Sequence, residues 1–308
     1  MKKRISVLLA FFLFVSLFSW IQPVRALDPA DVTPVPHTGG KPAQYTITFD
    51  LGTGAAYAIP ATGYFKITFP TDTKLPTSIA KADVTVNGTS PTADPTISGQ
   101  TVRILTPSAY ADGTTMTIVF MLTANIKNPL TTTGMLRLKV ETGYLVGSTE
   151  TKIEGPVDSN KYFIGFPATV TPSPNADTPS VGTEYVEYKI AWKTGNEGAL
   201  SKNTDTITIV FDAAYTLATW PGLGYIPGNY FTVNGTKVTS NAVCSGTPLT
   251  ITLKTPVDIA NSTAVTIIMT TQIGITNPVA GDYDLSVSSS KETTATDSLE
   301  YTIVNAIS

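Results

Sequence analysis

Apolar and polar residues alternate in short runs along most of this 308-residue chain, and Gly, Pro, Asn and Ser separate the runs. The stretch YTITF at Tyr45–Phe49 is typical, because every second side chain is large and apolar. Alternation with a period of two predicts β-strands that have one buried and one exposed face. Helical periodicity is scarce, so the pattern predicts an all-β protein.

The alternating runs form two groups of seven expected strands. The first group comprises Gln44–Phe49, Tyr64–Phe69, Asp83–Val86, Val102–Leu105, Thr115–Leu122, Met135–Glu141 and Ser148–Ile153. The second comprises Glu184–Trp192, Thr206–Phe211, Tyr230–Val233, Leu249–Leu253, Ala264–Thr270, Tyr283–Ser288 and Ser298–Val304. Seven short strands in a unit of this size fit an immunoglobulin-like sandwich, with a small barrel as the alternative.

Several short motifs occur in the same order in both groups. ADVTPVP at 30–36 returns as ATVTPSP at 168–174, and YTITF at 45–49 returns as YKIAW at 188–192. NIKNP, which ends at Pro129, matches GITNP, which ends at Pro278. The offset between matched motifs drifts only from 138 to 149 residues. A shared order at nearly constant spacing indicates that one module was duplicated.

The tetrapeptide VNGT occurs in both groups, at Val86–Thr89 and at Val233–Thr236. Asn-Gly between β-rich residues favours a type I′ hairpin turn, because both residues tolerate a positive φ. Both sites also satisfy the N-glycosylation sequon, as does the stretch at Asn261–Thr263. The turn alone explains why the position is duplicated, so we interpret VNGT as a feature of the scaffold.

The first residues are typical of a secretory signal peptide. The basic sequence KKR at 2–4 precedes an apolar run at 5–21, and small residues stand at Val24 and Ala26, as a cleavage site requires. The alternative is an uncleaved membrane anchor, since the apolar run is close to spanning length. Pro23 favours cleavage because it breaks a helix just before the site. We therefore expect removal of residues 1–26, export, an extracellular location and no membrane span in the mature chain.

Charge and cysteine content narrow the function classes. Loss of residues 1–26 leaves 16 Lys and Arg against 23 Asp and Glu, a formal net charge of −7. Such a chain offers no basic face for nucleic acid. Cys244 is the only cysteine, so no disulfide can form within the chain. An ordinary hydrophobic core must therefore hold the exported protein together.

These observations predict two tandem immunoglobulin-like antiparallel β-sandwich domains after a signal peptide. We place the first domain at residues 43–157 and the second at 181–308. A Pro-rich segment precedes each domain, at 27–42 and at 158–180. Proline would stiffen these segments into spacers.

A series of turn signals recurs over most of residues 40–305: VNG, then TP, then NP followed by G-x-x-x-L-x-V, and a closing Tyr-x-Ile strand at Tyr301–Ile303. This pattern resembles the tandem immunoglobulin-like modules of bacterial cell-surface proteins, including Gram-positive envelope and S-layer-associated proteins. The resemblance implies an extracellular structural or adhesive role and supplies no catalytic residue. The sequence contains no LPxTG-type sorting motif, so the mode of attachment to a cell stays open.

Residues that could carry chemistry are few. The single histidine, His37, lies in the Pro/Gly-rich segment. A flexible linker does not hold a catalytic base in a fixed position, so we expect a solvated linker residue. Cys244 has no base or cation beside it in the sequence, and we expect a small buried side chain. Asp282 and Asp284 could help to bind Ca²⁺, but alternating charge on a strand explains them more simply. We expect no catalytic residue, no metal and no other cofactor.

The two groups differ most in one loop, which is five residues longer in the second group and carries Trp220, Tyr225 and Tyr230 among Gly and Pro. Aromatic side chains on such a loop can stack on sugars or anchor a protein partner. The alternative is that Trp220 folds back and caps the core of the second sandwich.

Together these features predict a secreted, non-enzymatic surface or envelope protein with a structural or adhesive role. Its expected partners are cell-wall glycan or other surface proteins. One alternative is a carbohydrate- or protein-binding module that acts through the loop around Trp220. Another is a fibre subunit whose extended N-terminal segment adds a strand to a neighbour's sheet. The sequence leaves the oligomeric state open.

Overall fold

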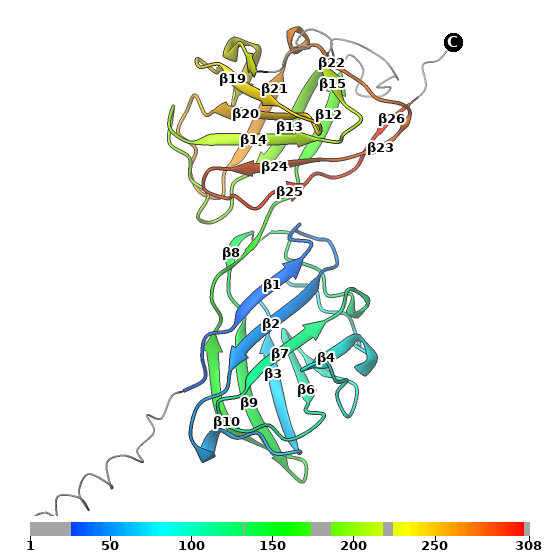
Figure 1. Ribbon diagram of the computed structural model, residues 1–308, viewed down its shortest axis with the longest axis vertical. Coiled ribbons are helices and arrows are strands. Elements are labelled where there is room, and N and C mark those ends of the chain that lie inside the picture. Colours follow the sequence, from blue (N-terminus) through cyan, green and yellow to red (C-terminus); the bar gives the residue numbers. More distant parts are fainter. Residues whose placement is uncertain (1–25, 132, 174–185, 218–223, 305–308) are drawn as a thin grey trace, which may run out of the picture.

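The chain folds into β-strands joined by turns and short 3₁₀ helices. The computed structural model describes residues 26–131, 133–173, 186–217 and 224–304, so the expected signal peptide lies outside this part of the chain except for Ala26. Within these ranges the helices are 3₁₀ helices of three residues each, which confirms the all-β prediction. Figure 1 shows two stacked groups of strands, which we call the N-terminal half (residues 26–166) and the C-terminal half (residues 167–304).

The N-terminal half consists of two main antiparallel sheets. Its elements are β1 (Asp31–Val35), β2 (Gln44–Asp50), η1 (Ala55–Tyr57), β3 (Gly63–Thr68), η2 (Lys81–Asp83), β4 (Val84–Val86), β5 (Thr96–Ser98), β6 (Thr101–Leu105), β7 (Thr115–Phe120), η3 (Leu122–Ala124), β8 (Gly134–Leu136), β9 (Lys139–Val146), β10 (Thr149–Asp158) and β11 (Tyr162–Ile164). One sheet has the order β1-β2-β7-β4 and the other β10-β9-β3-β6-β5, while β11 pairs with β8.

The C-terminal half repeats this plan. Its elements are β12 (Thr169–Ser173), β13 (Glu187–Lys193), β14 (Thr206–Phe211), β15 (Thr216–Leu217), β16 (Gly224–Ile226), η4 (Gly228–Tyr230), β17 (Phe231–Val233), β18 (Thr236–Lys237), β19 (Ala242–Ser245), β20 (Thr250–Lys254), β21 (Ala264–Met269), η5 (Thr271–Ile273), β22 (Ile275–Thr276), β23 (Gly281–Tyr283), β24 (Leu285–Ser289), β25 (Thr296–Asp297) and β26 (Tyr301–Ile303). The main sheets are β12-β13-β21-β17-β18 and β16-β19-β20-β14-β24-β25.

Both halves have the strand order of an immunoglobulin constant-type sandwich with an addition. In the N-terminal half, β1, β2, β7 and β4 take the places of strands A, B, E and D, and β3, β9 and β10 take those of C, F and G. The extra strands β5 and β6 follow D in the sequence and widen the second sheet beside C, as β19 and β20 do in the C-terminal half. The sandwich prediction is therefore confirmed over the barrel.

Each half has its own hydrophobic core. On β2 the side chains of Tyr45, Ile47 and Phe49 are buried and those between them are partly exposed, and β13 shows the same alternation. The buried side chains form two separate clusters, one within residues 27–164 and the other within 168–303. Full burial of one such side chain contributes roughly 1.5–3 kcal/mol.

The VNGT turns adopt the predicted conformation. In the first turn Asn87 and Gly88 have φ values of 48° and 79°, and in the second Asn234 and Gly235 have 49° and 77°. Two successive positive φ angles identify a type I′ turn. In the first turn Asn87 Oδ1 accepts the backbone N–H of a residue on β7 at 2.6 Å, and in the second Asn234 Oδ1 accepts an N–H from β21 at 2.8 Å. The asparagines therefore secure each hairpin to its sheet.

Side-chain hydrogen bonds also recur between the halves. Ser159 Oγ accepts the Leu138 N–H at 3.1 Å and donates to the carbonyl of the next residue at 2.8 Å. Ser298 Oγ accepts the Leu285 N–H at 3.1 Å and donates to the next carbonyl at 2.9 Å. The two halves thus share local hydrogen bonds as well as strand order.

Parts of the expected Pro-rich spacers are strands, which corrects the sequence interpretation. Every residue of β1 pairs with a residue of β2, and every residue of β12 pairs with a residue of β13. Pro34 and Pro172 occupy matched positions on these two edge strands, where a missing N–H can face away from the sheet. The strand signal was hidden because proline lowers the β propensity of each segment.

The N-terminal segment is also integrated into the core, because Leu27 and Ala30 are almost fully buried there. This packing corrects the expectation of a spacer at 27–42. It also argues against the fibre hypothesis in its original form, since residues 31–35 already pair within their own chain. The last part of the second expected spacer, residues 174–180, lies outside the described ranges.

Backbone groups of the two halves meet at a tight junction, visible as the narrow waist of the molecule in Figure 1. The side chain of Asn196 accepts the Met135 N–H at 2.7 Å and donates to the Met135 carbonyl at 2.8 Å. Gly134 and Gly195 lie so close that a Cβ on Gly195 would stand 2.6 Å from the Gly134 Cα. The junction therefore joins the halves through directed hydrogen bonds and direct backbone contact.

Candidate binding surface

Tyr225, one of the three predicted site residues, lies exposed on an edge strand. Its side chain, on β16, is 68% exposed, and Val243, opposite it on β19, is 48% exposed. Among the described residues β16 ends its sheet and has a strand on one side only. Opposed residues of an antiparallel pair have Cβ atoms roughly 5 Å apart, so Tyr225 and Val243 form one apolar surface.

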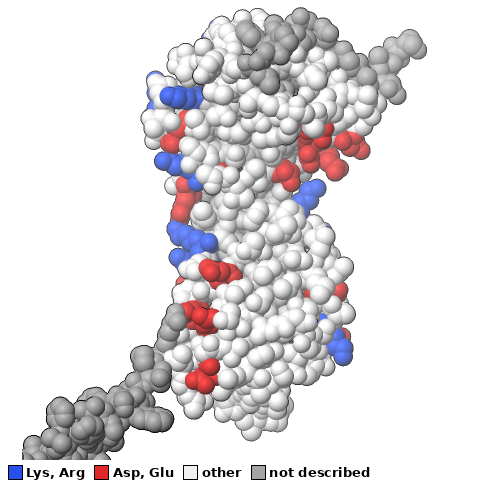
Figure 2. Space-filling model, viewed as in Figure 1, with Lys and Arg blue, Asp and Glu red and all other residues white. Residues whose placement is uncertain are grey.

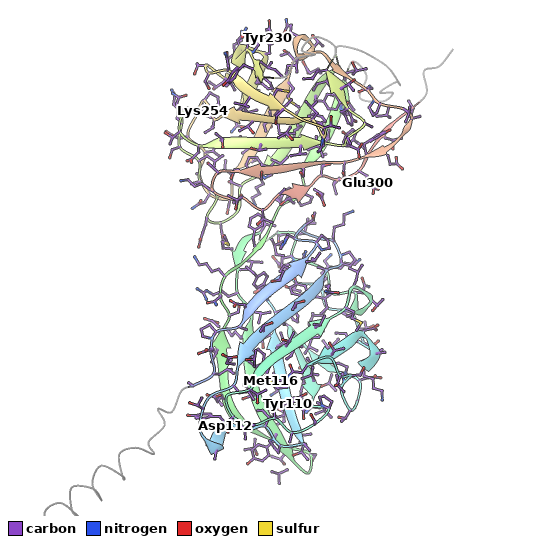
Figure 3. The ribbon with its side chains drawn as sticks, in the orientation of Figure 1. Tyr110, Asp112, Met116, Tyr230, Lys254 and Glu300 are labelled. Atoms are coloured by element: carbon purple, nitrogen blue, oxygen red, sulfur yellow. The ribbon has the colours of Figure 1, made fainter. Side chains whose placement is uncertain are left out.

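Tyr230 has a different role. It closes the 3₁₀ helix η4, is half-buried and packs against the core of the C-terminal half. Figure 3 shows it at the end of the C-terminal half that lies away from the N-terminal half. Its ring therefore packs as part of the fold, and the structure does not bring it together with Tyr225 as one exposed pair.

Trp220, the third predicted residue, lies outside the described residues, so both of its predicted roles stay predictions. The described part of the loop is fixed by a close backbone approach. A Cβ on Gly228 would stand 2.0 Å from the carbonyl oxygen of Ser240, so only glycine fits there. This contact holds the segment that follows β16 against the segment that precedes β19.

An open polar groove on the N-terminal half is a second candidate surface, which no motif in the sequence indicated. The groove has a volume of about 560 Å³, and its charged lining residues are Lys66, Arg103, Lys139, Glu141 and Glu150. They stand on the outer face of the sheet formed by β3, β6, β9 and β10. Period-two alternation predicted that such residues face outward, but strands distant in sequence bring them together.

Ion pairs engage most of these charged side chains. Glu150 lies 2.5 Å from Lys66 Nζ and 2.7 Å from Arg103 Nη1, and Lys66 Nζ is also 3.4 Å from Glu141. The hydrogen bond from Lys66 is the main cause that lowers the pKa of Glu150, and the same bond raises the pKa of Lys66. Because the charges offset one another, the groove offers polar contacts rather than a strong field of one sign.

The two residues considered for nucleophilic chemistry lie in different halves. His37 is half-buried, and its carbonyl accepts the Gly165 N–H at 2.9 Å. The expectation of a solvated linker residue is therefore wrong, because the segment after β1 folds back against the N-terminal half. Cys244 is 2% exposed, and burial raises the pKa of its thiol, which confirms the prediction of a buried side chain.

Acidic side chains gather on the C-terminal half beside the junction (Figure 2). Asp282 accepts a hydrogen bond from the Thr302 hydroxyl at 2.6 Å. Burial, followed by the nearby carboxylate of Asp297, raises the pKa of Asp284. Within the described ranges no group of three or more His, Cys, Asp and Glu side chains has an arrangement that could hold a metal ion. In the same part of the chain, no helix is long and apolar enough to cross a membrane.

No protein-family model matches the sequence. No curated protein matches it either. Among solved structures, the chain is similar to BslA, a bacterial hydrophobin, at 10% identity over 45% of this chain and 99% of that one, with a TM-score of 0.30.

Two further similar structures come from Streptococcus pyogenes and S. aureus. The C-terminal domain of the Streptococcus pyogenes antigen I/II-family protein AspA is 12% identical over 91% of this chain and 99% of that one, with a TM-score of 0.29. The collagen adhesin of S. aureus is 14% identical over 89% and 92%, with a TM-score of 0.24.

Proposed function

We propose that the chain is an exported, non-enzymatic cell-surface protein in which two copies of one sandwich module form a rigid spacer. The observation that carries this proposal is the junction, where Asn196 and Met135 exchange two hydrogen bonds and two glycine backbones touch. We expect these two directed hydrogen bonds and the backbone contact to restrict hinge motion at the junction. The matched turns and serine hydrogen bonds support the two-copy interpretation.

The distribution of reactive side chains supports a non-enzymatic role. The sequence holds one histidine and one cysteine, and these lie in separate halves with the cysteine buried. A nucleophile and its base must be within hydrogen-bond reach of one another. His37 and Cys244 therefore offer no such pair.

Labelling of intact cells tests the proposed location. We expect a membrane-impermeant amine reagent to modify Lys139 and Lys161, whose side chains are 55% and 45% exposed, on cells that express the full chain. A cytosolic protein in the same cells should stay unlabelled. Labelling of the chain only after cell lysis would contradict the proposal.

A second candidate function is adhesion through the surface formed by Tyr225 and Val243. An exposed aromatic side chain on a rigid strand brings a large contact area at a small cost in conformational entropy. This surface fits a flat apolar partner, such as a sugar ring of cell-wall glycan or an apolar patch on another surface protein.

Binding assays with isolated cell-wall glycan and with surface-protein extract would separate these partners. We expect Tyr225→Ala to weaken binding to one of them by about tenfold, a typical effect of removing an aromatic anchor. Leu299→Ala, which truncates another exposed apolar side chain, is the matched control and should bind normally. Equal binding by wild type and Tyr225→Ala would exclude this surface.

A further inference from the structure

Each half buries a glutamate that accepts a hydrogen bond from a glycine N–H. Glu154 Oε2 accepts from Gly52 at 3.3 Å, and Glu292 Oε1 accepts from Gly195 at 2.9 Å. The two glutamates are 8% and 7% exposed. Both glycines stand two residues after the second strand of their half, so the donors of the two hydrogen bonds occupy matching positions.

Glu154 has a second partner that Glu292 lacks among the described residues. Glu154 Oε1 accepts the backbone N–H of Leu27 at 2.8 Å, and Leu27 itself is only 4% exposed. The register of β10 against β9 shifts on both sides of Glu154. Such bulges re-aim side chains, and here they turn one carboxyl inward on a strand whose other residues are exposed or partly exposed.

A buried carboxylate is costly unless a positive charge compensates it. None of the salt bridges within the described residues involves Glu154. While Leu27 is joined to Ala26, its nitrogen is a neutral amide donor. Ala26 is exposed, so one side of the Ala26–Leu27 peptide bond lies at the surface. The other side, the Leu27 nitrogen, contacts the buried carboxylate of Glu154.

We infer that the Leu27 nitrogen is the N-terminus of the mature protein and that its α-ammonium group is the counter-ion of Glu154. This inference rests on the proposed export. The sequence supports the same bond independently, because Val24 and Ala26 are the small residues that an export peptidase requires three residues and one residue before its cleavage point. The Leu27–Glu154 contact thus gives the cleavage position a structural reason.

The chemical step is hydrolysis of the Ala26–Leu27 peptide bond by a peptidase with one molecule of water. Oxygen from water bonds to the carbonyl carbon of Ala26, which leaves as a carboxylate. The Leu27 nitrogen departs with the electron pair of the broken bond and takes up protons to become an ammonium ion. The donor at 2.8 Å from Glu154 thereby gains a positive charge, and a hydrogen bond from a neutral amide to the carboxylate becomes a buried ion pair.

Export of the full chain, followed by mass analysis and native amine labelling, tests this inference. We expect the mature chain to begin at Leu27. In reductive methylation near neutral pH, its α-amine should react at least about tenfold more slowly than Lys139. An unpaired α-amine would react faster than lysine, because its pKa is about 8 against about 10.4 for lysine.

Two glutamine variants make the test specific. Glu154→Gln should make the Leu27 amine react faster than Lys139, because the neutral side-chain amide of glutamine no longer stabilises the ammonium form of the Leu27 amine. Glu292→Gln removes the equivalent carboxyl in the other half, and we expect the Leu27 amine to stay protected. If Glu154→Gln does not accumulate, the pH dependence of wild-type labelling decides: the rate for a paired amine should keep rising with pH above about 8, whereas the rate for an unpaired amine should level off near its ordinary pKa of about 8.

The outcomes separate this inference from the proposed function. A mature chain that begins at another residue, or a Leu27 amine that reacts faster than Lys139 in the wild type, would overturn the ion pair and leave export standing. Retention of the chain inside the cell with residues 1–26 attached would overturn both.

Discussion

The hydroxyl of Tyr45 donates a hydrogen bond of 2.6 Å to Asn128 Oδ1, although the two residues are 83 positions apart. Tyr188 and Asn277 form the same bond, also 2.6 Å long, in the C-terminal half. Burial raises the pKa of both tyrosines well above the usual range, so each hydroxyl keeps its proton and stays a donor. The bond joins the centre of each core to the Asn-Pro motif that recurs in the sequence.

Replacement of Tyr45 by Phe should lower the free energy of unfolding by about 1–3 kcal/mol, because Asn128 Oδ1 would stay buried without its donor. Chemical unfolding followed by fluorescence measures this change. Tyr225→Phe is the control, since its hydroxyl lies on an exposed ring and the expected change is within about 0.5 kcal/mol. Equal stability of Tyr45→Phe and wild type would show that the buried bond is unimportant.

Replacement of Gly88 by Ala tests the type I′ turn without steric side effects. A Cβ at Gly88 would meet nothing within 4 Å, so the cost comes from the φ of +79° alone. We expect a loss of about 1–2 kcal/mol, the cost of placing an L-residue in the left-handed region. The thermal midpoint reports this loss. An unchanged midpoint would contradict the assigned turn conformation.

Replacement of Asn196 by Ala should weaken the junction without disturbing either core, because its side chain bonds to the backbone of Met135. Two lost hydrogen bonds are worth about 1–2 kcal/mol of coupling between the halves. Calorimetry should show the unfolding transitions of the two halves moving apart. Asn229→Ala, on the exposed surface of η4, should leave them unchanged. A variant that unfolds like the wild type would show that the junction transmits no stability.

The ion pairs of the groove should make stability depend on pH. The pKa of Glu150 is lowered in the folded state, so its contribution is fully present above the unfolded pKa of about 4.3 and is lost as pH falls through the folded value. At pH 7 the free energy of unfolding of the wild type should exceed that of Glu150→Gln by at most about 1 kcal/mol, since the ion pairs of Glu150 are partly exposed. The difference should shrink as pH falls below about 4, and a difference that stays constant with pH would contradict the assignment.

Local patterns in the sequence predicted the strands and turns well. All fourteen expected strands overlap observed ones, because their period-two alternation reflects burial of one face. The VNGT turns followed from the backbone freedom of Asn and Gly. By contrast, β1 and β12 escaped prediction because Pro34 and Pro172 mask them, although edge strands accept proline.

Relationships between distant residues could not be predicted. The Asn-Pro motif was correctly placed outside the strands, but nothing local shows that Asn128 receives the hydroxyl of Tyr45. The groove around Glu150 also depends on strand order, which one sequence does not specify. For the predicted loop, the aromatic content was informative, yet exposure separates Tyr225 from the half-buried Tyr230.

The rigid-spacer proposal can be tested by measuring the distribution of distances between two spin labels, one in each half. Labels at Ser148→Cys and Lys254→Cys would lie on exposed positions, while Cys244 is buried and should not be labelled. We expect a single narrow distribution in pulsed electron paramagnetic resonance, because hydrogen bonds and backbone contact fix the junction. A broad distribution, or several separate distances, would show that the halves move independently and would contradict the proposal.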